Sequence, residues 1–182
     1  MAARAVPASL HQLPNALTLL RLALIPVFVA LVVGADDAYS WPAAIVFGTA
    51  GVTDQVDGFL ARRWHVESAF GKIADPLADR LMIDAAVILL WHAGRLPWLA
   101  LAIPARDVVL MAGYPLLAGR GYDFEVNLTG KAATWLLYAS LGFTMVTRNS
   151  TDWPRWLFWV GFALAALAAA QYALKARREV VE

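Results

Sequence analysis

Six long apolar runs restrict what this 182-residue chain can fold into. A helix needs about 20 mostly apolar residues to cross a bilayer, and most of the runs approach that length. The composition agrees, because 60% of the residues are hydrophobic, 16% are charged and the mean hydropathy is +0.58. Soluble domains carry about 25% charged residues. The sequence therefore predicts an all-α, polytopic integral membrane bundle of six transmembrane helices.

The predicted spans are separated by turn-forming glycine, proline and asparagine residues. They cover residues 16–34, 41–60, 76–93, 98–118, 132–146 and 156–174, with the fifth starting nearer residue 128. No tandem repeat or low-complexity linker interrupts them, so residues 1–182 are predicted to form a single domain. A cleaved signal peptide is the alternative for the first run, but that run is long and no A-x-A-like site closes it.

Lysine and arginine are distributed unequally between the segments that join the runs. With the N-terminus in the cytoplasm, nine of these cations lie on the cytoplasmic side and three on the other. The nine are Arg4, Arg62, Arg63, Lys72, Arg120, Lys131, Lys175, Arg177 and Arg178, and the three are Arg95, Arg148 and Arg155. Since Lys and Arg favour cytoplasmic loops, both termini and the segment 62–75 are predicted to face the cytoplasm from the cell membrane.

Four aspartates lie in or beside the second and third runs. Asp54 and Asp57 are three residues apart and Asp75 and Asp79 are four apart, so each pair shares one face of a helix. A short loop joins the two helices, which brings the pairs to the same depth at the cytoplasmic edge. The sequence predicts that the four carboxylates converge.

Four converging carboxylates at a membrane edge require cations. One Asp inside a span costs about 2.5–3.5 kcal/mol on insertion scales, and no Lys or Arg cluster nearby is large enough to offset four. Hard oxygen ligands suit Mg²⁺, Mn²⁺ or Ca²⁺, and four carboxylates suggest a two-metal site. The alternative for a single residue such as Asp75, which precedes Pro76, is a helix cap.

Small and basic residues around the aspartates indicate a phosphate-bearing ligand. Gly58 and Gly71 leave the backbone open to close approach, although Gly58 alone is also explained by helix packing. Arg62, one turn beyond Gly58, can pair with a phosphate. The chain has no cysteine, which excludes thiolate chemistry, and its net charge of +1 gives no field for binding nucleic acid.

This segment resembles the complete signature of the CDP-alcohol phosphotransferase (CDP-alcohol phosphatidyltransferase) family, over residues 54–79. The matching positions, in the family's spacing, are Asp54, Asp57, Gly58, Ala61, Arg62, Gly71, Asp75 and Asp79. The resemblance implies that the four aspartates bind Mg²⁺ or Mn²⁺ and that Asp79 is the catalytic base. It implies that Gly58, Ala61, Arg62 and Gly71 surround the CDP moiety of CDP-diacylglycerol, and that the protein is a homodimer.

Three further cations in or beside the spans point to an anionic acceptor. Arg21 and Arg106 are costly inside a membrane and usually functional; the alternative is that they pair with a buried carboxylate such as Asp84 or Asp107. Lys131 begins a helix, where the dipole favours anions, and a bound phosphate would reconcile the two. The acceptor-binding residues are therefore predicted to be Arg106, Lys131 and Arg21. Choline, ethanolamine and serine are disfavoured.

Flanking segments resemble the bacterial phosphatidylglycerophosphate synthase and cardiolipin synthase branch of the family. They are residues 13–21, 75–79, 106–107 and 130–134. The chain departs from that branch with Arg80 in place of Lys and Asp107 in place of Glu, and Asp84 is an additional acid without an assigned role. The resemblance favours glycerol 3-phosphate as acceptor, giving phosphatidylglycerophosphate with release of CMP. Phosphatidylglycerol, giving cardiolipin, is the alternative, and inositol phosphate is less favoured.

Two interpretations from other classes are open at this point. Intramembrane aspartates also occur in divalent-cation transporters, where discontinuous helices hold the ion near the bilayer midplane. Here the acids lie near the cytoplasmic edge, and transport gives Gly58 and Arg62 no role. A purely structural membrane protein would bind neither metal nor nucleotide.

Overall fold

The structure is a computed structural model that describes residues 13–64, 69–118 and 128–181. Side chains are described at 16–54, 56, 77–109, 111–112 and 128–171. The described chain forms six α-helices and two short 3-10 helices, and no strand occurs in it. In chain order these are α1 (Leu13–Val33), η2 (Asp36–Ala38), α2 (Trp41–Trp64), α3 (Ala69–His92), η3 (Trp98–Leu101), α4 (Ala102–Ala118), α5 (Leu128–Val146) and α6 (Trp153–Val181). The all-α prediction is confirmed.

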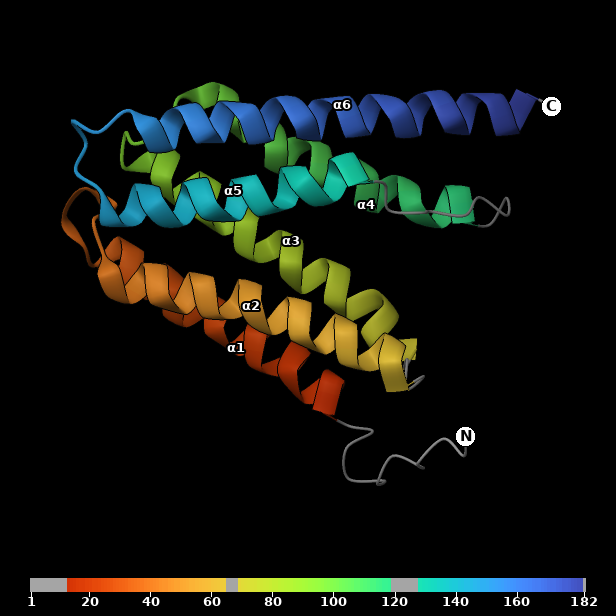
Figure 1. Cartoon of the computed structure of the whole chain (residues 1–182), viewed down its shortest axis with the longest axis horizontal. Coiled ribbons are helices and arrows are strands. Elements are labelled where there is room, and N and C mark those ends of the chain that lie inside the picture. The colour runs from red at the N-terminus through yellow and green to blue at the C-terminus, as the bar shows by residue number, and fades with distance from the viewer. Residues whose placement is uncertain (1–12, 65–68, 119–127, 182) are drawn as a thin grey trace.

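The helices alternate in direction along one bundle (Figure 1). α1 packs against α2 and α5 packs against α6, while α3 crosses between these two pairs. The start of α1, the end of α2, the start of α3, the end of α4, the start of α5 and the end of α6 all point toward one end of the bundle (Figure 1). The segments predicted to carry the chemistry therefore lie at a common end.

The centre of the bundle is filled by side chains from several helices. Phe28 of α1, Phe47 of α2, Met82 of α3, Leu141 of α5 and Phe158 of α6 are almost completely buried. The rings of Phe28 and Phe47 lie with their centroids 5.5 Å apart, which links α1 to α2. This apolar centre fixes the register in which α2, α3 and α5 meet at the site.

One buried arginine connects α5 to η2 at the other end of the bundle. Arg95, between α3 and η3, donates hydrogen bonds to the carbonyl oxygens of Thr144 and Thr147 over 2.6 Å each, and to that of Asp37 over 3.0 Å. The last carbonyls of a helix have no partner within the helix, so Arg95 satisfies the end of α5 and joins it to η2.

Two of the described helices are long and apolar enough to cross a membrane. Their apolar windows are Ala16–Val33, with a mean hydropathy of 2.5, and Trp153–Gln171, with 1.3. α2 and α3 carry the aspartates and several cations, and α4 has only 17 residues. A membrane protein is thus indicated, whereas six spans with both termini in the cytoplasm stay a prediction.

Several predicted boundaries differ from the structure. α3 begins at Ala69 rather than at residue 76, so Asp75 lies inside the helix and not at its start. Polar residues such as Lys72 lower the hydropathy of this first part without breaking the helix. The fourth run is divided into η3 and α4: Pro97 before it is extended (φ −73°, ψ 161°), and its first turn is 3-10. α6 begins earlier and ends later than its apolar run.

Candidate functional site

Arg21 and Asp54 form an ion pair between α1 and α2. Nη1 of Arg21 lies 2.7 Å from Oδ1 of Asp54, and the arginine side chain is completely buried. A buried arginine is stable only beside compensating charge or acceptors. Arg21 therefore neutralises part of the charge of the first aspartate. Its predicted role in binding the acceptor, together with Arg106 and Lys131, stays a prediction.

A hydrogen bond between Tyr138 and Asp79 connects two further helices, α5 and α3, near this ion pair. The Tyr138 hydroxyl, in the middle of α5, donates a hydrogen bond to Oδ1 of Asp79 in α3 over 2.8 Å. Arg21 attracts Asp79, and Asp54 lies near enough to Tyr138 for an electrostatic interaction. These four residues, which we call the aspartate cluster, come from α1, α2, α3 and α5.

The aspartate cluster has oxygen atoms suitable for a hard divalent cation. Asp54 and Asp79 are both partly exposed. Asp57 and Asp75 lie within continuous helix, in α2 and α3, but their side chains fall outside the described residues. Among the side chains that are described, no three of His, Cys, Asp or Glu gather as a metal site. The convergence of all four stays a prediction.

The predicted CDP-binding residues also lie on these two helices. Gly58, Ala61 and Arg62 belong to the last part of α2 and Gly71 to the first part of α3, and the described side chains do not include theirs. The backbone therefore brings them to the same end of the bundle as the aspartates (Figure 1). Their contacts with a nucleotide remain a prediction.

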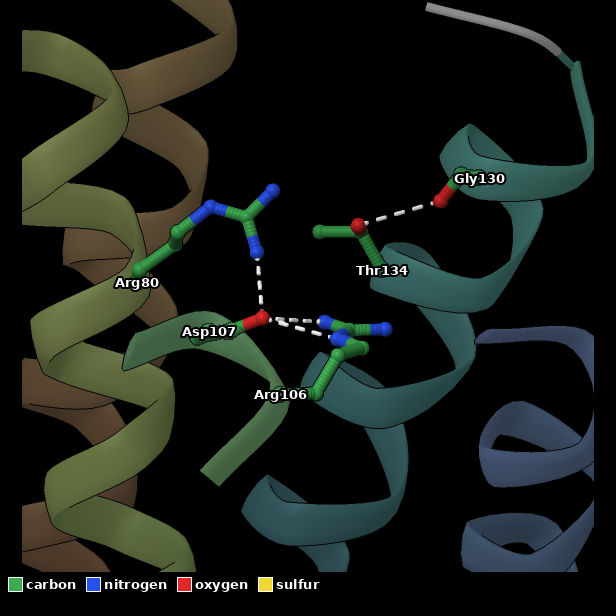
Figure 2. Close-up of polar contacts among 5 residues, drawn as sticks. All are labelled: Arg80, Arg106, Asp107, Gly130 and Thr134. Atoms are coloured by element: carbon green, nitrogen blue, oxygen red, sulfur yellow. Dashed lines mark hydrogen bonds and ion pairs between the residues drawn. The ribbon is translucent and has the colours of Figure 1, made fainter. Parts of the chain in front are cut away.

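A second charged group, which we call the arginine cluster, lies between α3, α4 and α5 (Figure 2). Asp107 is buried, and its Oδ1 accepts hydrogen bonds from Arg80 Nη1 over 2.5 Å and from Arg106 Nε over 2.8 Å. Nη2 of Arg106 lies 2.7 Å from the same oxygen. One carboxylate thus holds two guanidinium groups.

The arginine cluster faces the first turns of α5. Figure 2 shows Arg106 and Arg80 on the side of Thr134, whose hydroxyl donates to the carbonyl oxygen of Gly130 over 3.1 Å. Lys131 belongs to the same first turn of α5 and its side chain is exposed. The pairing of Arg106 with Asp107 that the sequence left open is present, whereas Arg21 pairs with Asp54.

Asp84 approaches the arginine cluster from one turn further along α3. It interacts electrostatically with Asp107, Arg80 and Arg106. Its Oδ1 is buried and has no hydrogen-bond partner among the described residues. No role could be assigned to Asp84 from the sequence, and its place beside two arginines explains how a second acid is tolerated there.

The sequence interpretation missed Tyr138 and the function of Arg80. Tyr138 is 59 positions from Asp79, so only the register of α5 against α3 brings the two together. A signal was present, because a tyrosine within an apolar run needs a partner for its hydroxyl. Arg80 was noted only as a departure from lysine, yet it is one of the two cations on Asp107.

A cavity of about 610 Å³ lies at the other end of the bundle. Its lining includes Arg95, Asp152, Arg155, Trp156 and Trp159. None of the residues predicted to bind metal, CDP or acceptor contributes to it. The polar clusters, not this hollow, are the candidate site.

The chain is similar to known proteins over most of its length. The family model described as CDP-alcohol phosphatidyltransferase matches residues 11–167, which include both clusters.

Curated relatives cover most of the chain. The CDP-diacylglycerol–glycerol-3-phosphate 3-phosphatidyltransferase of Bacillus subtilis (strain 168) is 33% identical over 81% of this chain and 88% of its own length. The protein of that name from Escherichia coli (strain K12) is 31% identical over 94% of this chain and 98% of its own length. The CMP-forming cardiolipin synthase of Streptomyces coelicolor is 40% identical, over 70% of this chain and 62% of its own length.

Proposed function

The chain belongs to the CDP-alcohol phosphatidyltransferase family, and we propose that it transfers a phosphatidyl group from CDP-diacylglycerol to glycerol 3-phosphate, releasing CMP. The donor and acceptor follow the names of the Bacillus and Escherichia relatives. The observation that carries the acceptor is the arginine cluster, in which one buried carboxylate holds two partly exposed guanidinium groups.

The aspartate cluster is the proposed centre of the reaction. Asp54, Asp57, Asp75 and Asp79 would hold one or two Mg²⁺ or Mn²⁺ ions, and the described oxygens of Asp54 and Asp79 fit such ions. Bound metal would supply neutralisation of the charge that develops on the departing CMP. Gly58, Ala61, Arg62 and Gly71 are proposed to surround the CDP moiety, as the family resemblance implies.

Asp79 is the proposed general base. It takes the proton from the acceptor hydroxyl while that oxygen forms a bond to the phosphorus that bears the lipid, and the bond from this phosphorus to CMP breaks. Among the described side chains Asp79 accepts a hydrogen bond from neutral Tyr138 and is paired with no arginine within 4 Å, so it stays available for a proton.

The arginine cluster and Lys131 are the proposed site for the acceptor phosphate. Arg80 and Arg106 are 34% and 27% exposed, so each can direct N–H groups to a phosphate while it holds Asp107. Lys131 adds charge at the first turn of α5. Arg21 was predicted to join them, and its contact with Asp54 supports a role closer to the aspartates.

Phosphatidylglycerol is the second candidate acceptor, because the Streptomyces relative is named a cardiolipin synthase. Its phosphodiester carries one negative charge and suits the same cations. That relative is covered over only 62% of its length, which favours glycerol 3-phosphate.

The proposed setting is the cytoplasmic edge of the cell membrane, in a six-span homodimer. The lipid donor and product stay in the bilayer, which explains why the polar clusters lie within long apolar helices.

Product identification tests the proposal. Purified protein in liposomes receives CDP-diacylglycerol with glycerol 3-phosphate, phosphatidylglycerol or inositol phosphate, and the released CMP and the new lipid are measured. We expect phosphatidylglycerophosphate to form in a Mg²⁺-dependent reaction. Cardiolipin as the product would support the second acceptor, and divalent-metal flux without CMP release would contradict the proposal.

A further inference from the structure

Tyr138 makes a contact for which the proposed reaction has no assignment. Its hydroxyl donates to Oδ1 of Asp79 over 2.8 Å, from a helix that carries none of the four signature aspartates. One oxygen of the carboxylate is thereby engaged and the other is left for different partners. A hydrogen bond to an ionised group is stronger and more directional than one between neutral groups.

The ring of Tyr138 packs against α2. Its centroid lies 4.8 Å from that of Phe47. At Gly51, one turn before Asp54, an added Cβ would lie 2.9 Å from Cε1 of Tyr138, a distance that real side chains do not reach. The absence of a side chain at Gly51 is therefore what lets the ring lie against α2 while its hydroxyl reaches α3.

We propose that Tyr138 is a positioning residue that holds the Asp79 carboxylate in its reactive orientation. The absence of a side chain at Gly51 leaves the space that the Tyr138 ring needs. This inference rests on the proposed function, in which Asp79 is the base and a metal ligand. Partners of this kind fix the rotamer of a ligating or catalytic carboxylate, and their loss reduces metal affinity or activity by about 10–100-fold.

A purely structural role is the alternative. A tyrosine hydroxyl within apolar helices needs some acceptor, and Asp79 could serve only to satisfy it. Removal of the hydroxyl would then change stability, and would leave turnover and metal affinity of the folded protein unchanged.

Tyr138→Phe separates the two roles, because it removes one oxygen and keeps the ring. We expect kcat for CMP release to fall by about tenfold or more, while KM for CDP-diacylglycerol changes by less than about threefold. The dissociation constant for Mn²⁺, followed by electron paramagnetic resonance without substrate, should rise by about tenfold. Tm should stay within about 2 °C. The control is Tyr39→Phe, whose exposed hydroxyl accepts a hydrogen bond from Nε1 of Trp41 over 3.3 Å.

Gly51→Ala tests whether the space at Gly51 is needed for the Tyr138 ring, and Gly48→Ala is its matched control. An added Cβ at Gly48 meets nothing within 4 Å, in the same helix. We expect Gly51→Ala to lower kcat by about tenfold, and Gly48→Ala to have no effect. Since both changes would act on one hydrogen bond, Gly51→Ala combined with Tyr138→Phe should be about as active as Tyr138→Phe alone.

Each outcome bears on one proposal. Normal kcat and Mn²⁺ affinity in Tyr138→Phe, or a variant that loses stability or fails to fold, overturns the positioning role. Independent, multiplying losses in the double variant overturn the role of Gly51. Failure of the wild-type protein to release CMP would instead contradict the proposed function itself, and that result is obtained before any variant is made.

Discussion

Charge compensation differs between the two described aspartates of the aspartate cluster. Asp54 has a buried guanidinium group, that of Arg21, 2.7 Å away. Asp79 has a neutral hydroxyl, that of Tyr138, as its described hydrogen-bond partner. A carboxylate bound tightly to arginine is already neutralised, whereas one held by a neutral donor keeps its charge for another ligand. This difference in hydrogen-bond and ion-pair partners suits a structural and ligating role for Asp54 and a catalytic role for Asp79.

Asp79→Asn should abolish turnover while substrate binding persists. Asparagine keeps the size of the side chain but does not accept a proton, and loss of a general base lowers rates by about 10²–10⁴-fold. CMP release measures turnover, and calorimetric binding of CMP measures the nucleotide site. Asp36→Asn, at an exposed acid of η2, is the control and should behave as wild type. Near-normal turnover in Asp79→Asn would exclude the base role.

Asp107→Ala should destabilise the protein by about 3 kcal/mol, because it leaves two guanidinium groups without their buried counter-charge. Thermal unfolding in detergent, followed by tryptophan fluorescence, gives the change. Asp152→Ala is the comparison: its pair with Arg155 is exposed on both sides, and exposed pairs contribute about 0–1 kcal/mol. Equal losses of stability in the two variants would show that Asp107 does not stabilise the protein as a buried counter-charge. In the folded fraction, Asp107→Ala should raise the acceptor KM more than that of the donor.

Helices could be predicted from the sequence more completely than the contacts between them. Apolar runs located all six α-helices, although the fourth run is divided between η3 and α4. They missed the first turns of α3, where polar residues extend the helix beyond its apolar part. The aspartate spacing predicted which helices carry the site, but the partners Arg21 and Tyr138 depend on how α1 and α5 are rotated and shifted against α2 and α3. No local pattern encodes that register.

Gly161 allows α6 to approach α5 closely, and a larger residue should separate them. An added Cβ there would lie 3.2 Å from three atoms of Leu136 and Leu137, one of them a backbone nitrogen. Gly161→Val should therefore lower the free energy of unfolding by about 1–3 kcal/mol, through overpacking. It should also lower kcat, because α5 carries Tyr138. Gly48→Val, at an open position of α2, is the control. An unchanged Tm in Gly161→Val would mean that α6 moves freely.

The whole molecule combines a polar end with an outer surface that suits lipid. Large apolar side chains are exposed on several helices, among them Val33 of α1, Ile45 of α2, Val109 of α4 and Trp135 of α5. Exposed apolar side chains on so many helices suit a membrane or partner interface. Among the helices as far as the structure describes them, only α1 and α6 are apolar enough to qualify as spans on their own. The helices that carry the charged clusters would be able to cross the membrane because their polar side chains pair with one another inside the bundle.

Cysteine labelling distinguishes six spans from two, and the absence of native cysteine makes single substitutions unambiguous. Ser68→Cys lies between α2 and α3, and Ser150→Cys lies between α5 and α6 at the other end of the bundle. With six spans and the N-terminus inside, a membrane-impermeant maleimide added to intact cells should label Ser150→Cys and leave Ser68→Cys unlabelled. Detergent-permeabilised cells, in which both should react, are the control. If only α1 and α6 crossed, both cysteines would lie on one side and label alike, and labelling of Ser68→Cys alone would mean the opposite orientation. The six-span arrangement is our prediction, because it would keep the aspartate and arginine clusters beside the cytoplasm while the apolar surfaces of α2, α4 and α5 meet lipid.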